Sequence, residues 1–153
     1  MRNWYSRARR QDGAALIEAA FTLPIMLLVC IGVLEFGRAY QAWQVVTNAS
    51  REGARVAVLP AYTDESAIAR VKTYLKNGGL DATIVDSEDT KVEITATTIP
   101  VNEDGTITAS AAQVRVEFPF SFMVLQPVAQ LVVSDSTAGD SFPMVATTVM
   151  RNE

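Results

Sequence analysis

The stretch AALIEAAFTLPIMLLVCIGVL, residues 14–34, decides the fold of this chain. Its length is close to the ~20 apolar residues that a helix needs to cross a bilayer, and Glu18 is the only charged residue within it. Arginines crowd the N-terminus ahead of it, so the positive-inside rule predicts a cytoplasmic N-terminus. Tyr40 and Trp43 follow it, where interfacial aromatic residues are expected. The sequence therefore predicts a membrane helix over residues 14–35 that crosses the membrane once, with the N-terminus in the cytoplasm and the C-terminal domain outside it.

A cleaved signal peptide is the alternative interpretation of this segment. Its apolar core would be shorter, roughly 7–15 residues, and would end at a small-x-small site. Gly37 and Ala39 form such a pair. However, the apolar run is longer than such a core, and Glu35, Phe36 and Arg38 lead into further helix-forming sequence. A retained anchor is therefore the favoured prediction.

Glu18 is an unusual residue for a membrane helix, because a carboxylate there costs roughly 2.5–3.5 kcal/mol near the centre and less near the edge. It is the fifth residue after Gly13, and residues 1–13 form a basic leader. A glutamate tolerated near the interface is one interpretation. The other comes from the whole pattern of basic leader, glycine and apolar helix with glutamate at the fifth place, which resembles the processing signature of type IV prepilins.

The resemblance to prepilins implies two roles. A membrane aspartyl peptidase, the prepilin peptidase, would cleave between Gly13 and Ala14 on the cytoplasmic side. Glu18 would then pair with the freed N-terminal amine of a neighbouring subunit during assembly. The second role is physically consistent, because opposite charges in a low-dielectric setting relieve each other's desolvation cost. Pro24 removes a helical hydrogen bond, and a kink is expected there.

Residues 9–58 also resemble one particular pilin family. The matching motifs are GAALIEAAFTLP at residues 13–24, LEFGRA at residues 34–39 and NASREGARVA at residues 48–57. Together they are similar to the TadE-like minor pilins or pseudopilins of the Tad (tight adherence, Flp) pilus system. The resemblance implies an envelope protein that a prepilin peptidase processes and that contacts other pilin or pilus-machinery subunits during pilus assembly.

Residues 36–59 are predicted to continue the helix outside the membrane until Pro60. The apolar positions fall at helical spacing and define one face: Phe36, Ala39, Trp43, Val46, Gly53 and Ala57. Arg51, Glu52 and Arg55 lie on the opposite face. They have two interpretations, either a contact with another subunit or a solvated face on which Gly53 allows close packing.

Residues 60–153 are predicted to form a small α+β domain. A helix over residues 64–77 would be capped by Thr63 or Asp64 and stopped by the glycine pair at residues 78–79. Its apolar stripe is Ile68, Val71 and Leu75. Strand patterns follow at residues 82–85, 91–99, 107–108, 113–120 and 144–150, with a hairpin turn at residues 102–105. These elements predict an antiparallel sheet of three or four strands packed on the helices.

The segment FPFSFMVLQPVAQLVV, residues 118–133, is strongly apolar but contains two prolines and polar residues, which argue against a second membrane span. One interpretation is a buried strand and a short helix that close the core. The other is an exposed apolar surface that docks on another pilus subunit.

The composition argues against several classes of function. The chain has no histidine, which excludes zinc sites with imidazole ligands and Ser-His or Cys-His catalysis. Cys30 is the single cysteine, so no intramolecular disulfide can form. Removing residues 1–13, with four arginines and one aspartate, would change the net charge from −4 to −7, which argues against nucleic-acid binding.

The sequence nominates no enzyme site, no cofactor and no small-molecule substrate. Asp86, Glu88 and Asp89 cluster, but the D-x-D-x-D-G loop of a calcium site is absent, so a solvated turn is favoured. The resemblance and the apolar helix together predict a minor pilin or pseudopilin. The alternatives are an uncleaved, single-pass, membrane-anchored periplasmic binding or scaffold protein, and an anchored hydrolase.

Overall fold

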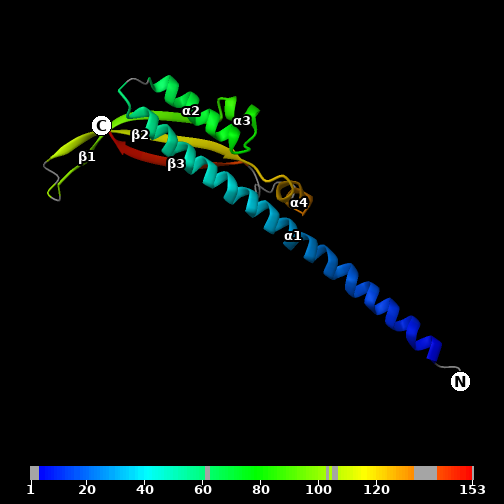
Figure 1. Cartoon of the computed structure of the whole chain (residues 1–153). Coiled ribbons are helices and arrows are strands. Elements are labelled where there is room, and N and C mark those ends of the chain that lie inside the picture. Colours follow the sequence, from blue (N-terminus) through cyan, green and yellow to red (C-terminus); the bar gives the residue numbers. More distant parts are fainter. Residues whose placement is uncertain (1–3, 61–62, 103, 105–106, 133–140, 153) are drawn as a thin grey trace.

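The structure is a computed structural model that describes residues 4–60, 63–102, 104, 107–132 and 141–152. A long helix passes beside a small domain and extends far beyond it (Figure 1). The elements are, in chain order, α1 (Trp4–Ala57), α2 (Asp64–Asn77), α3 (Ala82–Asp86), β1 (Lys91–Pro100), β2 (Thr108–Phe120), α4 (Leu125–Val132) and β3 (Phe142–Arg151). This arrangement confirms the predicted α+β class with a long N-terminal apolar helix.

The helix α1 is continuous through Pro24. Its 54 residues span about 80 Å at ~1.5 Å per residue. The part from Gly13 onward contains the one segment of the described chain that is long and apolar enough to cross a membrane. None of the described residues buries this segment. The C-terminal half of α1 packs instead against the sheet and α2.

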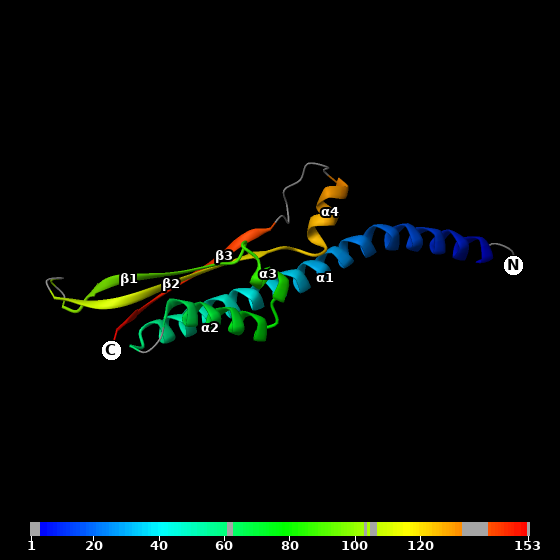
Figure 2. The same ribbon diagram turned by 90° about the horizontal axis from the view of Figure 1, so that it is seen from above.

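The helices α1 and α2 cover one face of a three-stranded antiparallel sheet with the order β1-β2-β3 (Figures 1 and 2). Val116 of the central strand pairs with Val92 of β1 and with Ala146 of β3. The even-numbered side chains of β2 from Ala112 to Phe120, such as Val114 and Val116, are buried. The predicted strands at residues 91–99, 113–120 and 144–150 are confirmed, although β2 begins earlier and takes in Thr108.

The face of α1 that meets the sheet differs from the predicted one. Small residues form the contact: Ala42, Val46, Ala49, Ser50, Gly53 and Ala54 are buried. Of the predicted apolar face, Val46 and Gly53 belong to this contact, whereas Phe36 is 65% exposed and Trp43 is 45% exposed. Small side chains let the helix approach the sheet closely, and the Ser50 and Thr148 hydroxyl oxygens lie 2.8 Å apart across this contact.

The prediction for α2 is confirmed in its bounds and its cap. The Thr63 hydroxyl accepts a hydrogen bond from the Ser66 N–H at 3.4 Å, and the Ser66 hydroxyl accepts one from the Thr63 N–H at 3.1 Å. This reciprocal pair is a capping box, which satisfies donors that a helix start leaves free. Val71 and Leu75 are fully buried, as expected for the apolar stripe.

The predicted strand at residues 82–85 is wrong, because these residues form the short helix α3. The Asp81 carboxylate accepts hydrogen bonds from the Thr83 N–H at 2.8 Å and from the Thr83 hydroxyl at 2.6 Å. An N-terminal cap of this kind starts a helix even where the following residues have high β-propensity. The predicted turn at residues 102–105 lies partly outside the described residues, but the Val101 N–H donates to the Ile107 carbonyl at 2.8 Å beside it.

Candidate functional site

The predicted processing and assembly residues lie together on the unpacked part of α1. Gly13, Ala14 and Glu18 are exposed, within a single helical segment. A Cβ atom on Gly13 would meet nothing within 4 Å, so nothing in the described fold requires a glycine there. The processing site is thus sterically open.

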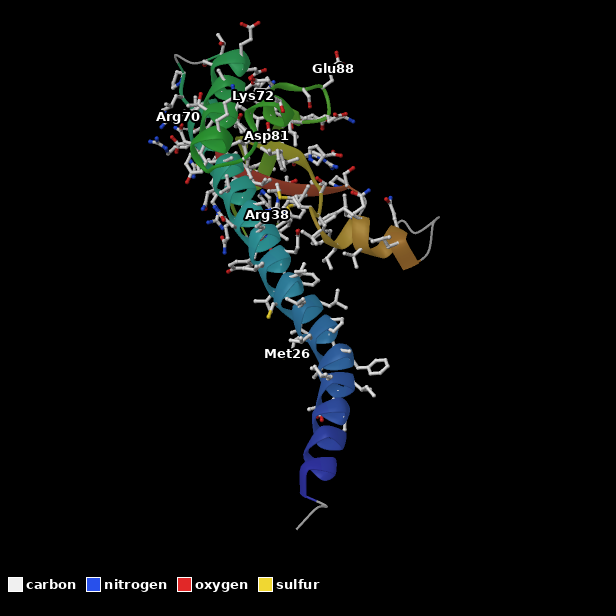
Figure 3. All side chains as sticks on the ribbon, turned by 90° about the vertical axis from the view of Figure 1, so that its right-hand side faces the viewer. Met26, Arg38, Arg70, Lys72, Asp81 and Glu88 are labelled. Carbon is white, nitrogen blue, oxygen red and sulfur yellow. The ribbon has the colours of Figure 1, made fainter. Side chains whose placement is uncertain are left out.

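The Glu18 carboxylate has no partner among the residues that the structure describes. No ion pair or side-chain hydrogen bond in the described part of the chain uses it. The Thr22 hydroxyl donates to the backbone carbonyl of Glu18, not to its side chain. Large apolar side chains, including Leu16, Ile17 and Phe21, surround it and are exposed. Figure 3 shows this part of α1 with side chains projecting away from the rest of the molecule. The carboxylate is thus available to bind a cationic group of another molecule, in surroundings that are otherwise apolar.

Glu35 is a buried junction residue that the sequence did not single out for a role. Its side chain ends the apolar run and is buried, with 4% of the residue exposed. Its Oε1 accepts hydrogen bonds from the backbone N–H groups of Met123 at 3.1 Å and Val124 at 3.0 Å, just before α4. The Arg38 guanidinium donates to Oε2 at 3.0 Å. These charge-assisted bonds tie the outer end of the candidate span to α4.

An aromatic cluster covers this junction. The rings of Phe36 and Phe122 lie 5.9 Å apart, those of Phe120 and Phe122 lie 5.5 Å apart, and those of Phe120 and Phe142 lie 5.7 Å apart, all edge to face. Arg38, labelled in Figure 3, lies with its guanidinium carbon 5.4 Å from the centre of the Phe120 ring. The cluster joins α1, β2 and β3, so it packs the membrane-side end of the sheet against the helix.

Glu52 connects α1 to α2. Its Oε1 lies 2.9 Å from the Arg55 guanidinium and 2.9 Å from that of Arg70 on α2. The hydrogen bonds from Arg55 and then Arg70 lower the pKa of the Glu52 carboxyl to about 2, against the opposing effect of burial. Arg51 and Arg55 remain exposed to solvent. Of the three predicted contact residues, Glu52 is thus occupied within the chain, whereas Arg51 and Arg55 face outward.

Gly53 is the packing residue that the second interpretation of this segment expected. A Cβ atom there would lie 2.4 Å from Cγ2 of Val71 and 3.2 Å from Cγ1 of Val114. Only a residue without a side chain fits where α1, α2 and β2 meet. The close-packing interpretation is therefore confirmed for Gly53.

The acidic turn at residues 86–89 is exposed at its carboxylates. Asp86 forms an ion pair with Lys76 of α2 at 2.8 Å, and Glu88 projects from the domain surface in Figure 3. Within the described residues, no three potential metal ligands come together. Within the described residues, the carboxylates of this turn are therefore not gathered around a common point where they could hold a cation.

An open groove of about 370 Å³ lies beside the junction, between α1 and the segment joining α2 to α3. Arg38 and Asp81 are the charged residues that line it, together with apolar side chains such as Ala42, Phe118 and Met123. The groove brings together no pair of carboxylates of the kind that general acid–base catalysis uses.

Comparison with known proteins supports the resemblance of the N-terminal motifs. The family model described as "TadE-like protein" matches residues 13–55. No curated protein and no solved structure matches the chain. The matched segment includes Gly13, Glu18, Glu35 and Glu52 and ends within α1. It confirms the similarity to TadE-like proteins, and with the apolar helix it indicates a membrane-anchored, Tad pilus-associated protein.

Proposed function

From the TadE-like character of residues 13–55, we propose that the chain is a minor pilin or pseudopilin of a Tad/Flp-type pilus. The helix α1 holds the subunit in the inner membrane with its N-terminus in the cytoplasm, and the α+β domain stands outside. The subunit either enters the filament or supports its assembly from the membrane.

One observation carries the proposal, namely the contrast among the glutamates of α1. Glu35 and Glu52 each accept several hydrogen bonds from groups of the same chain. Glu18 has no such partner in the described chain and sits in an apolar surface. Because an unpaired carboxylate in lipid is costly, a cationic partner from outside the chain explains its presence. The freed amine of Ala14 on a neighbouring subunit is such a partner.

The surroundings of Gly13 support cleavage by a prepilin peptidase. A glycine inside a helix costs about 1 kcal/mol relative to alanine, and neither packing nor a positive φ angle calls for one at this position. A glycine at this position suits a cleavage site, since a protease must bring its catalytic groups close to the backbone. We propose Gly13–Ala14 as the bond that is cleaved.

The outward face near the end of α1 supplies a second proposed contact. Arg51 and Arg55 are exposed and basic, while the remainder of the chain after residue 13 carries a net charge of −7. Glu52 fixes the Arg55 guanidinium in place. An acidic surface of a neighbouring subunit, which could be another copy, would complement this pair.

The test is to express the chain in its native cells with its own pilus machinery and to determine its N-terminus by intact mass. We expect a mature chain that begins at Ala14, and a Gly13→Val variant that begins at Met1. A wild-type chain that keeps its leader would contradict the proposal and favour an uncleaved anchor. A start near Tyr40 would indicate a secreted domain.

The assembly role is tested separately with Glu18→Gln. We expect normal cleavage but a loss of at least about tenfold in the amount recovered with pili, because the neighbouring amine would remain unpaired in lipid. Glu88→Gln, a change of the same chemistry on the exposed turn, should leave recovery unchanged. Equal recovery of both variants would exclude Glu18 as an assembly contact.

A further inference from the structure

The helix α4 exposes an apolar surface that nothing in the described chain covers. No charged residue occurs from Phe118 to Ser134. Met123, just before the helix, is 69% exposed, and Leu131 near its end is 85% exposed. Val124 adds further exposed apolar surface. Leaving this surface in water is unfavourable in proportion to its area.

The position of α4 along α1 indicates what covers this surface. The Glu35 carboxylate holds the backbone N–H groups of Met123 and Val124, and Glu35 directly follows the apolar run that ends at Leu34. The contact between the rings of Phe36 and Phe122 holds the segment before α4 at the same position along α1. The start of α4 is therefore level with the outer end of the candidate span.

The direction of α4 agrees with this position. In Figures 2 and 3 it projects sideways from α1, across the axis of the long helix and not along it. If α1 crosses a bilayer, a helix that leaves it sideways at the end of the apolar run lies in the plane of the membrane–water interface. Short helices with an apolar surface bind there by burying that surface at the boundary between headgroups and acyl chains.

We propose that α4 is an interfacial helix that inserts its apolar surface, including Leu131 near its end, into the outer leaflet of the same bilayer that α1 spans. This inference rests on the membrane anchor in the proposed function. The subunit would then contact the membrane at two places, and the Glu35 junction would set the depth and orientation of the outer domain. Departure from the membrane would require α4 to release the lipid as well as α1.

The test measures the depth of α4 in the full chain, reconstituted in vesicles of phosphatidylcholine and phosphatidylglycerol. Cys30→Ser removes the native thiol, and a nitroxide is attached to a single cysteine introduced at Leu131, at Leu27 or at Ala69. Leu27 lies in the candidate span, whereas Ala69 is exposed on α2. Collision with oxygen, which partitions into lipid, is compared with collision with a water-soluble nickel chelate. We expect the oxygen-to-nickel ratio to be severalfold higher at Leu131 than at Ala69, and highest at Leu27.

Three results would overturn the inference. A Leu131 label as accessible to nickel as the Ala69 label, with Leu27 still in lipid, would show that α4 lies in water while the anchor holds. A Leu131 label shielded from both reagents would show that protein, such as a second copy, covers α4. A Leu27 label that is accessible to nickel would show that α1 does not span the bilayer, and would contradict the proposed function as well.

A second variant tests the positioning role of Glu35. We expect Glu35→Ala to increase the mobility of the Leu131 label and to lower its oxygen-to-nickel ratio, because the N–H groups before α4 lose their acceptor. Glu88→Ala, on the far acidic turn, should change neither value. Unchanged label behaviour in Glu35→Ala would show that the carboxylate does not position α4.

Discussion

The two halves of α1 form one continuous helix, yet they follow opposite rules of side-chain size. The membrane-side half exposes large residues such as Leu16 and Phe21, and they touch no other element. The outer half buries small residues such as Ala49 and Ala54 against the sheet. Where the helix packs on the sheet, the space between the two backbones limits the size of the side chains. Where helix meets lipid, only apolarity matters, since lipid chains adapt to any shape.

The same division applies to the glutamates. In the outer half, Glu52 pairs with arginines of its own chain, and at the boundary Glu35 accepts backbone N–H groups. In the membrane-side half, Glu18 has no partner in the described chain. The carboxylates of the outer half and of the boundary are thus paired within the chain, whereas no described residue pairs with the carboxylate of the membrane-side half.

The largest expected effect comes from emptying the core that the outer half contacts. Leu75→Ala should lower the free energy of unfolding of the outer domain by about 2–5 kcal/mol, because Leu75 is fully buried and its loss leaves a cavity. The measurement is urea unfolding of the full chain in detergent micelles, followed by circular dichroism. Leu27→Ala, in the exposed half, should leave the transition unchanged. An equal loss of unfolding free energy in both variants would contradict the difference between the two halves of α1.

A glycine in each half provides the second test. Gly53→Ala should destabilise the outer domain by about 1–3 kcal/mol, because the added methyl group overlaps Val71 in a stiff, packed contact. Gly32→Ala meets open space and should leave the stability of the outer domain unchanged. Thermal unfolding of the two variants under identical micelle conditions measures the difference. A stable Gly53→Ala variant would mean that α1 and α2 do not approach so closely.

The smallest effect concerns the Glu52 ion pairs. The pKa of Glu52 is lowered from 4.5 to about 2, so its stabilisation is complete above pH 4.5 and is lost as the pH falls toward 2. We expect Glu52→Gln to cost on the order of 1 kcal/mol at pH 7, because both arginines are more than half exposed and solvent screens the pairs. The cost should shrink as the pH falls below 4.5. Glu93→Gln, on the exposed face of β1, is the control, and a pH-independent difference would exclude the ion pairs as the cause.

The sequence predicted those elements that local signals determine. The bounds of α2 follow from the Thr63 cap, the stripe that contains Val71 and Leu75, and the glycine that stops the helix. The alternating strands follow equally from their period of two residues. Close packing at Gly53 was one of the two interpretations of its segment, and the structure supports that interpretation.

The sequence could not predict features that depend on distant partners. Glu35 receives N–H groups from residues 88 and 89 positions away, and no spacing rule links them. Trp43 was placed on one helical face with Val46 by its spacing, whereas the contact with the sheet buries small residues such as Ala49 and leaves Trp43 half exposed. At α3, the Asp81 cap outweighs the β-propensity of the residues after it.

The continuity of α1 has a mechanical consequence. Glu18 and Glu35 are about 25 Å apart along the helix at ~1.5 Å per residue, and no loop or hinge separates them. A force that lifts the outer domain along the axis of α1 therefore moves Glu18 by about the same distance. Pro24 lies between them and lacks the N–H that would complete a helical hydrogen bond, so it is the point along this rod where bending costs least. Any load on the outer domain is thus transmitted to Glu18 along a helix whose most easily bent position is Pro24.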